Sequence, residues 1–170
     1  MPSPSQDSPE ILRVLSENGV RFVLIGGLPA ILQGSPFPTE DVDVTPEQSA
    51  ANLVRLSQAL TALDARGYAQ TAPEGLPFSH SADSLAAAQV WNLTTRLGRI
   101  DISFVPNGTT GFPDLDQTAL TIAIRGTDVR VADLADVIRS KQAANRPKDQ
   151  RVLPTLREIL AARHERERRA

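Results

Sequence analysis

LIGGLPAILQGSPFPTEDVDV, residues 24–44, joins an apolar run, a glycine pair and two aspartates one residue apart. The run at 20–26 is short, apolar and bounded by glycines, so it predicts a buried strand. Residues 28–33 predict a short helix, and the proline-containing loop at 34–38 cannot continue it. DVDV at 41–44 alternates polar and apolar residues, as a strand with one solvated face does.

The segments outside this stretch alternate between helix and strand patterns. They predict a helix from Ser8 to Gly19, a long helix opened by Thr45–Pro46 and ended by Gly67, a loop at 68–81, a hairpin of 89–95 and 99–105, strands at 119–124 and 128–131, and helices at 133–145 and 150–166. This order predicts one α/β or α+β domain over 1–170, with a small mixed sheet, flanking helices and C-terminal helices. Residues 1–7 are rich in Pro and Ser, and we expect them to be disordered.

Composition excludes several classes of protein. The net charge of -2 argues against a protein that coats nucleic acid by bulk charge, although it permits a local basic groove. The chain has no cysteine, which excludes disulfides, cysteine nucleophiles and thiolate metal sites. The N-terminus lacks the pattern of a signal peptide, and no apolar run approaches the roughly 20 residues of a membrane span. We therefore expect a cytoplasmic protein without a membrane partner.

Asp41 and Asp43 are the first candidate site residues. Side chains two apart on a strand point to the same side, so both carboxylates share a face while Val42 and Val44 pack behind them. Two such carboxylates repel each other, and a bound cation relieves the repulsion. Oxygen ligands favour Mg²⁺ or Mn²⁺. The alternative is a chance pair on an exposed strand.

Asp101 is the third candidate. In RIDISF, Ile100 and Ile102 face one way and Asp101 faces the other. If this strand lies beside DVDV, three carboxylates gather on one face. Such a cluster can hold two metal ions about 4 Å apart, which activate an attacking hydroxyl and neutralise a leaving phosphate.

Backbone and basic groups that could bind phosphates occur at two places. Gly26 and Gly27 follow a strand and precede a helical turn, which leaves N–H groups open to a phosphate. The two lysines of the chain, Lys141 and Lys148, flank Arg146. The alternatives are a tight turn, a lysine that extends to solvent from the end of a helix, and ordinary residues at a helix start.

These residues together resemble the motifs of the minimal nucleotidyltransferase-fold proteins, in particular the AbiEii/MenT-type toxins of toxin–antitoxin pairs. The matching positions are Gly26, Gly27, Ala30, Gly34, Pro36, Thr39, Asp41 and Asp43, then Gly98 to Ile102, and finally Lys141, Arg146, Lys148 and Asp149. The chain departs from the pattern in three ways: Ala30 comes one place late, Phe37 stands where relatives often have a basic residue, and Gly27 where many have serine.

The resemblance implies a nucleotidyltransferase fold and transfer of NMP from an NTP with two Mg²⁺ or Mn²⁺ ions. It implies that Asp41 and Asp43 bind both metal ions. Asp101 would bind only the ion that activates the acceptor hydroxyl. The resemblance also implies that the triphosphate is bound by the Gly26–Gly27 turn and Lys141, together with Arg146 or Lys148. Asp41, Asp43, Asp101 and Lys141 are thus the expected catalytic residues. In MenT-like toxins the acceptor is the 3′ end of tRNA, so tRNA and a cognate antitoxin are expected partners.

Other functions remain open at this point. DVDVT also fits the motif of haloacid-dehalogenase-type phosphatases, although SPFPTE before it is not the apolar strand they require. Within the transferase fold, the acceptor could be a protein, as in AMPylation, or a small molecule such as an aminoglycoside. An inactive nucleotide-binding or interaction module is a further alternative. Thr39 lies on the same side as Asp41 and Asp43 and is a candidate regulatory phosphosite, since its phosphorylation would compete with the NTP phosphates and switch the enzyme off. The alternative is a hydroxyl that only forms a hydrogen bond within the loop.

Overall fold

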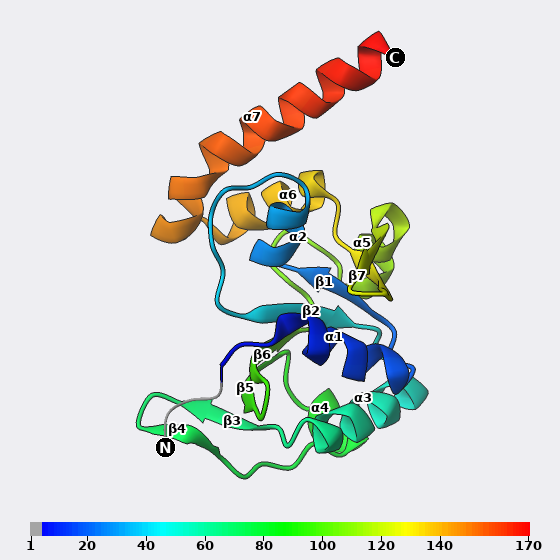
Figure 1. Ribbon diagram of the computed structural model, residues 1–170. Coiled ribbons are helices and arrows are strands. Elements are labelled where there is room, and N and C mark those ends of the chain that lie inside the picture. Colours follow the sequence, from blue (N-terminus) through cyan, green and yellow to red (C-terminus); the bar gives the residue numbers. More distant parts are fainter. Residues whose placement is uncertain (1–4) are drawn as a thin grey trace.

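Apolar side chains alternate along β1 (Phe22–Ile25) and supply a packed layer to each face of the central sheet. The structure is a computed structural model that describes residues 5–170. Phe22 and Leu24 point into one hydrophobic core, whereas Val23 points into the other. Helices therefore cover both faces of the sheet around β1 (Figure 1).

The sheet has eight strands in the order β4-β3-β5-β6-β2-β1-β8-β7. The other strands are β2 (Val42–Pro46), β3 (Arg66–Ala69), β4 (Ala72–Leu76), β5 (Val90–Thr95), β6 (Gly98–Ser103), β7 (Leu120–Ile124) and β8 (Thr127–Val131). The pairs β2–β6 and β1–β8 are parallel, and the remaining neighbours are antiparallel. This arrangement confirms the predicted mixed sheet flanked by helices.

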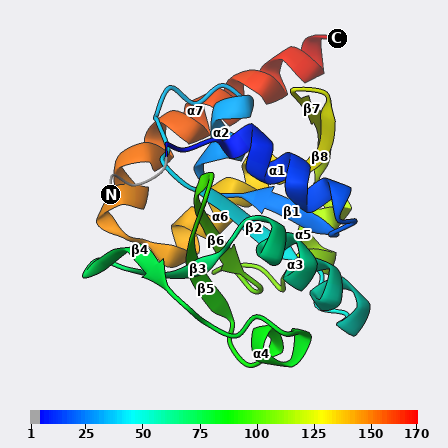
Figure 2. The same cartoon turned by 60° about the horizontal axis from the view of Figure 1, so that its bottom comes forward.

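In the described part of the chain, three helices pack on one face of the sheet and four on the other. The first set is α1 (Ser8–Glu17), α3 (Ala50–Ala62) and α4 (Ala82–Ala86). The second set is α2 (Gly27–Leu32), α5 (Phe112–Thr118), α6 (Leu134–Ala144) and α7 (Pro147–Arg169). Figure 2 views the sheet from the side of α1 and α3, with α6 and α7 beyond. Among residues 5–170, none of the helices has the length and apolar composition needed to cross a bilayer.

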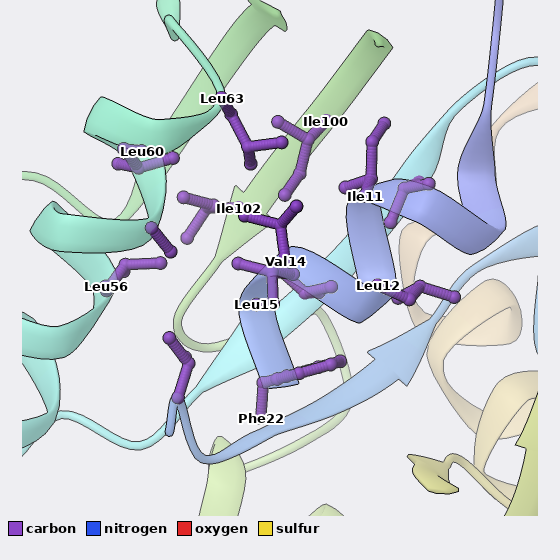
Figure 3. Close-up of a cluster of buried hydrophobic side chains, with 14 of the residues drawn as sticks. Ile11, Leu12, Val14, Leu15, Phe22, Leu56, Leu60, Leu63, Ile100 and Ile102 are labelled. Atoms are coloured by element: carbon purple, nitrogen blue, oxygen red, sulfur yellow. The ribbon is translucent and has the colours of Figure 1, made fainter. Parts of the chain in front are cut away.

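The first core lies between the sheet and the helices α1 and α3. Figure 3 shows Leu15 of α1, Leu56 and Leu60 of α3, and Ile100 and Ile102 of β6 meeting there. All five side chains have no measurable exposure. Val42 and Val44 of β2 belong to the same core, so β2 and β6 are anchored through the side chains of one face.

The second core leaves part of the opposite face uncovered. It gathers Val23 of β1 with side chains from α2, α5, α6 and α7, including Leu134, Leu153 and Leu156. Within the described residues, neither β2 nor β6 contributes a side chain to this core. Polar side chains on that face of β2 and β6 therefore border a cleft instead of a packed layer.

The long helix after DVDV begins and ends differently from its prediction. Thr45 and Pro46 are the last residues of β2, and α3 begins at Ala50, where the Ser49 side chain accepts a hydrogen bond from the Asn52 N–H. Gly67 belongs to β3 and does not end the helix. Threonine followed by proline is a common pattern at the start of a helix. Here the Thr45 side chain is buried because the residue belongs to a strand of the sheet.

Four further elements differ from the sequence prediction. The predicted loop at 68–81 contains most of β3 and β4, and the short helices α4 and α5 were not predicted. The break expected near Pro147 is the N-terminus of α7, which continues through Pro154. Pro154 is exposed, so the side of the helix where it removes a backbone hydrogen bond is solvated.

The first described residues contact the body of the domain. The Gln6 side-chain amide donates to the Arg99 carbonyl at 3.0 Å, and its oxygen accepts from the Arg99 N–H at 2.7 Å. The Asp7 side chain caps α1 by accepting from the Glu10 N–H at 3.3 Å. Of the expected disordered segment 1–7, residues 1–4 lie outside the described part, and Gln6 and Asp7 are held by these hydrogen bonds.

Candidate active site

The parallel pairing of β2 with β6 brings two of the predicted aspartates together. Asp43 lies directly opposite Asp101, between the pairs Val42–Ile100 and Val44–Ile102. The valines and isoleucines are buried in the first core, so both carboxylates must point to the other face. The strand of Asp101 therefore lies beside DVDV as the sequence pattern required. Asp41, directly before β2, borders the same cleft.

The glycine pair makes room for side chains of the site. Gly26 has a φ of +78°, and a Cβ atom on it would lie 2.4 Å from Asp43 Oδ2. A Cβ atom on Gly27 would lie 2.8 Å from the Thr39 Cβ. Any larger residue at either position would displace the Asp43 carboxylate or Thr39. The sequence pattern found the pair, but it did not reveal these two contacts.

A cleft of about 720 Å³ opens between this face of the sheet and the helices α6 and α7. Its border contains every predicted site residue: Gly26, Gly27, Thr39, Asp41, Asp43, Asp101, Lys141, Arg146 and Lys148. The aspartates come from the sheet and the cations from α6 and the start of α7. The Thr39 side chain is half-buried beside Gly27. Its phosphorylation stays a prediction.

Asp149 holds two of the three cations. Its side chain is completely buried, and its Oδ1 lies 3.6 Å from Lys141 Nζ. Its Oδ2 accepts from the Arg146 Nε at 2.8 Å and from the Arg146 N–H at 3.1 Å. Burial acts to raise the pKa of Asp149, but the hydrogen bonds and charge of Arg146, aided by Lys141, hold it below its ordinary value. The sequence pattern includes Asp149 as a motif position at a helix start, but it did not predict that Asp149 holds Lys141 and Arg146. Its place three residues after the cap of α7 was the available signal.

Lys148 differs from Lys141 and Arg146 because it has no anionic partner. It is exposed, and within residues 5–170 it forms no ion pair. Its charge still acts on the aspartates, since both Lys148 and Lys141 lower the pKa of Asp43. The cleft thus holds opposite charges on its two sides, close enough to influence each other.

The surroundings of Asp43 and Asp101 make ionisation of these two carboxyl groups unfavourable. Burial, followed by the negative charges of Asp101 and Asp41, raises the pKa of Asp43 to about 6. Burial also raises the pKa of Asp101, against the opposing charge and hydrogen bond of Arg99, and Asp41 adds to the rise. Asp41 and Asp101 thus disfavour ionisation of Asp43, and Asp41 disfavours that of Asp101, which is the condition that a cation would relieve.

Arg99 and Tyr68 support Asp101. Arg99 Nη2 donates to Asp101 Oδ1 at 3.0 Å, and its Nε donates to the Leu93 carbonyl at 3.1 Å. The guanidinium carbon lies 3.6 Å from the centre of the Tyr68 ring. Arg99 is part of the motif that the sequence showed, but Tyr68 fell in a predicted loop and was missed.

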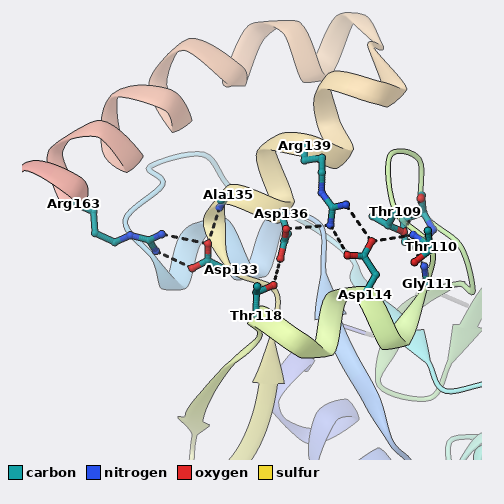
Figure 4. Close-up of polar contacts among 11 residues, drawn as sticks. Thr109, Thr110, Gly111, Asp114, Thr118, Asp133, Ala135, Asp136, Arg139 and Arg163 are labelled. Carbon is teal, nitrogen blue, oxygen red and sulfur yellow. Dashed lines mark hydrogen bonds and ion pairs between the residues drawn. The ribbon is translucent and has the colours of Figure 1, made fainter. Parts of the chain in front are cut away.

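A polar network at the other end of the cleft fixes α6 to α5 (Figure 4). Arg139 of α6 binds Asp114 of α5 at 3.1 Å and Asp136 of its own helix at 3.1 Å. Asp136, which borders the cleft, also accepts from Thr118. The network therefore fixes α6, the helix that also carries Lys141, against α5.

The donor set fits a hard divalent cation. Asp41, Asp43 and Asp101 offer only oxygen atoms, and Mg²⁺ and Mn²⁺ prefer such ligands. Within the part of the chain that the structure describes, no three His, Cys, Asp or Glu side chains are already gathered closely enough to hold an ion. Binding of one ion by all three carboxylates therefore requires them to draw together.

No protein-family model matches the chain, and no curated protein is similar to it in sequence. Solved structures that share its fold include LnuA and ANT(2'')-Ia. The lincosamide antibiotic adenylyltransferase LnuA, solved with lincomycin bound, is 14% identical and aligns over 91% of this chain and 99% of its own, with a TM-score of 0.59. The antibiotic-resistance factor ANT(2'')-Ia is 15% identical over 93% of this chain and 89% of its own, with a TM-score of 0.52. The chain therefore has a nucleotidyltransferase fold, and its membership of the AbiEii/MenT group stays a prediction.

Proposed function

We propose that this protein is a metal-dependent nucleotidyltransferase that transfers NMP from an NTP to a hydroxyl acceptor. The observation that carries the proposal is the placement of Asp43 opposite Asp101 on adjacent parallel strands, on a cleft that Lys141 and Lys148 also border. The nucleotidyltransferase fold shared with LnuA supports the same reaction class.

In the proposed reaction, the acceptor oxygen forms a bond to the α-phosphorus of the NTP. The bond from that phosphorus to the oxygen bridging the β-phosphate breaks, and pyrophosphate leaves with the electron pair while the hydroxyl proton passes to water. Divalent ions, when bound, neutralise the phosphates and favour the deprotonated hydroxyl. Asp41, Asp43 and Asp101 would hold these ions.

The remaining side chains of the cleft would bind and orient the triphosphate. Lys141 and Arg146 are held in place by the buried Asp149, so little side-chain freedom is lost when phosphates bind them. Lys148 is unpaired within the described residues and adds a full charge. The N–H groups of Gly26 and Gly27 would complete the phosphate site, as the family resemblance implies.

For the acceptor, we propose the 3′ end of tRNA. The support is the ordered match of three motifs to the AbiEii/MenT-type toxins. On this proposal, the added nucleotides block aminoacylation, and a cognate antitoxin protein controls the enzyme.

A small hydroxylated molecule is the second candidate acceptor. Beside Asp101, the β5–β6 side of the cleft presents Val90, Asn92 and Ser103, which carry no charge. Such a surface suits an acceptor without phosphates. LnuA, which aligns over nearly its whole length, is described with the antibiotic lincomycin bound.

The test supplies the purified protein with Mg²⁺, each NTP in turn radiolabelled at the α-phosphate, and total tRNA. Parallel reactions contain an aminoglycoside or a lincosamide. The Asp41→Ala protein should lose all transfer, whereas Asp83→Ala, which removes an acidic residue of α4 outside the cleft, should not. Label on tRNA supports the first acceptor, label on the antibiotic supports the second, and label on protein indicates AMPylation. A protein that neither transfers label nor binds NTP with Mg²⁺ would contradict the proposed function, and one that only binds NTP would be an inactive module.

A further inference from the structure

α7 differs in charge from the rest of the protein. It carries seven basic and four acidic residues, whereas the other residues of the chain comprise eleven basic and sixteen acidic ones. The helix is therefore a positive element on a negative body. A polyanion that approached the protein would be repelled by most of its surface and attracted to α7.

α7 also connects the cleft with the outside of the molecule. Its first turns border the cleft through Lys148, Val152 and Leu156, and Leu153 packs into the second core. Its C-terminal turns extend away from the sheet, so that the end of the helix stands clear of the other elements (Figure 1). With about 1.5 Å of rise per residue, the distance along the axis from Lys148 to Arg166 is about 27 Å.

Four cations lie along one flank of this helix. At 3.6 residues per turn, positions 148, 151, 166 and 169 fall within roughly 60° of each other around the axis. We call Lys148, Arg151, Arg166 and Arg169 the basic flank. Lys148, Arg151 and Arg166 are exposed, and within residues 5–170 none of them forms an ion pair.

The acidic residues of α7 leave three of the four flank cations unpaired within residues 5–170, and pair only with Arg169 of the flank. Asp149 is buried and faces Lys141 and Arg146. Glu165 is bound by Arg168 and Arg169, and Glu167 lies 3.8 Å from Arg163. Three of the four acidic side chains of α7 thus already form ion pairs. Among the described residues of α7, Glu158 is the acidic side chain without one.

We infer that the basic flank of α7 is the docking surface for an RNA acceptor, whose 3′ end enters the cleft beside Lys148. The inference rests on the proposed function and locates its acceptor. Lys148 and Arg151 at one end of the flank, and Arg166 and Arg169 about 27 Å farther along the helix, can contact phosphates at two places along one polynucleotide. An RNA is favoured over an acidic protein partner because the flank leads directly into the cleft, where a reacting hydroxyl has to lie.

The experiment compares two doubly substituted proteins that lose the same charge. R151Q/R166Q neutralises the basic flank outside the cleft, and R96Q/R125Q removes two exposed arginines from turns of the sheet. Binding of fluorescein-labelled tRNA is followed by anisotropy with Mg²⁺ and without NTP, across a range of salt concentrations. Each released phosphate contact contributes about 0.9 to the slope of log affinity against log salt. R151Q/R166Q should therefore bind about tenfold or more weakly at about 0.1 M salt, with a slope lower by roughly two.

The outcomes separate this inference from the proposed function. A normal salt slope and affinity in R151Q/R166Q, or an equal loss in R96Q/R125Q, would overturn the docking surface even if tRNA is the acceptor. Wild-type protein that binds no tRNA would also overturn it, whereas transfer of label to a small acceptor would leave the proposed function intact. Unchanged Mg²⁺-dependent NTP binding in R151Q/R166Q is expected and shows that the cleft is undisturbed. Binding of an acidic protein in place of tRNA would assign α7 to that partner and refute the inference.

Discussion

Replacing Asp43 by asparagine should stabilise the metal-free protein near neutral pH. Burial and the neighbouring carboxylates raise the pKa of Asp43 from 3.8 to about 6. The native state therefore favours the protonated side chain more than the unfolded state does. The side chain destabilises the native state little below about pH 4, and the penalty grows as the pH rises through 6. A shift of about two pKa units corresponds to about 3 kcal/mol above pH 7.

The Asp43→Asn protein should lack this penalty. Asparagine has nearly the same shape as aspartate, so its close packing on Gly26 is kept. In EDTA at pH 7, its free energy of unfolding should exceed that of wild type by up to about 3 kcal/mol, which is a rise of roughly 6–12 °C in Tm for a chain of this length. The difference should disappear toward pH 4. The Asp43→Asn protein should also lack transfer activity.

Urea denaturation between pH 4 and 8, followed by circular dichroism, measures these differences. Asp128→Asn is the control, because Asp128 is an exposed carboxyl of β8 outside the cleft. Mg²⁺ should stabilise wild type more than the Asp43→Asn protein, since an ion that binds only the native state raises the free energy of unfolding. An Asp43→Asn protein less stable than wild type at pH 7, or one with the same pH dependence, would refute the reasoning.

Three further substitutions test the geometry of the site. Gly26→Ala should lose activity and about 2 kcal/mol or more of stability because its Cβ meets Asp43; Gly126→Ala, with a similar φ of +84° but nothing within 4 Å, should cost only about 1 kcal/mol. Asp149→Leu should destabilise the protein by about 1–3 kcal/mol in urea and raise the KM for NTP, because it removes the carboxylate that pairs with the partly buried Lys141 and the exposed Arg146; an unchanged KM would argue against its positioning role. Asp101→Asn should abolish transfer in the labelling assay while NTP binding, measured by calorimetry, stays within about threefold of wild type.

Much of the fold around the site could be predicted because its signals are local. The buried strand before Gly26, the alternation in DVDV and the hairpin of 89–105 each have a period or a turn that nearby residues determine. The strands β3 and β4, at one end of the sheet, could not be predicted in this way. Their sequences, RGYA and APEGL, contain glycine and proline and bury little, so only pairing with β5 and with each other defines them.

The candidate site shows the same division. The three aspartates and the basic residues were found because each belongs to a recognisable run of sequence. Tyr68 and the connection of Asp149 to Lys141 were not, because they depend on contacts between segments distant in the chain or on burial. The close approach of Asp43 to Gly26 likewise depends on the antiparallel register of β1 with β2, which no local pattern specifies.

The order of the site residues along the chain bears on when a newly synthesised molecule can become active. Gly26, Asp43 and Asp101 are made first, but Lys141 is held by Asp149, which follows Asp101 by 48 residues. A nascent chain that stops before α7 has carboxylates without the cations that Asp149 holds in place. The proposed triphosphate site is therefore completed only after the first turns of α7 have left the ribosome.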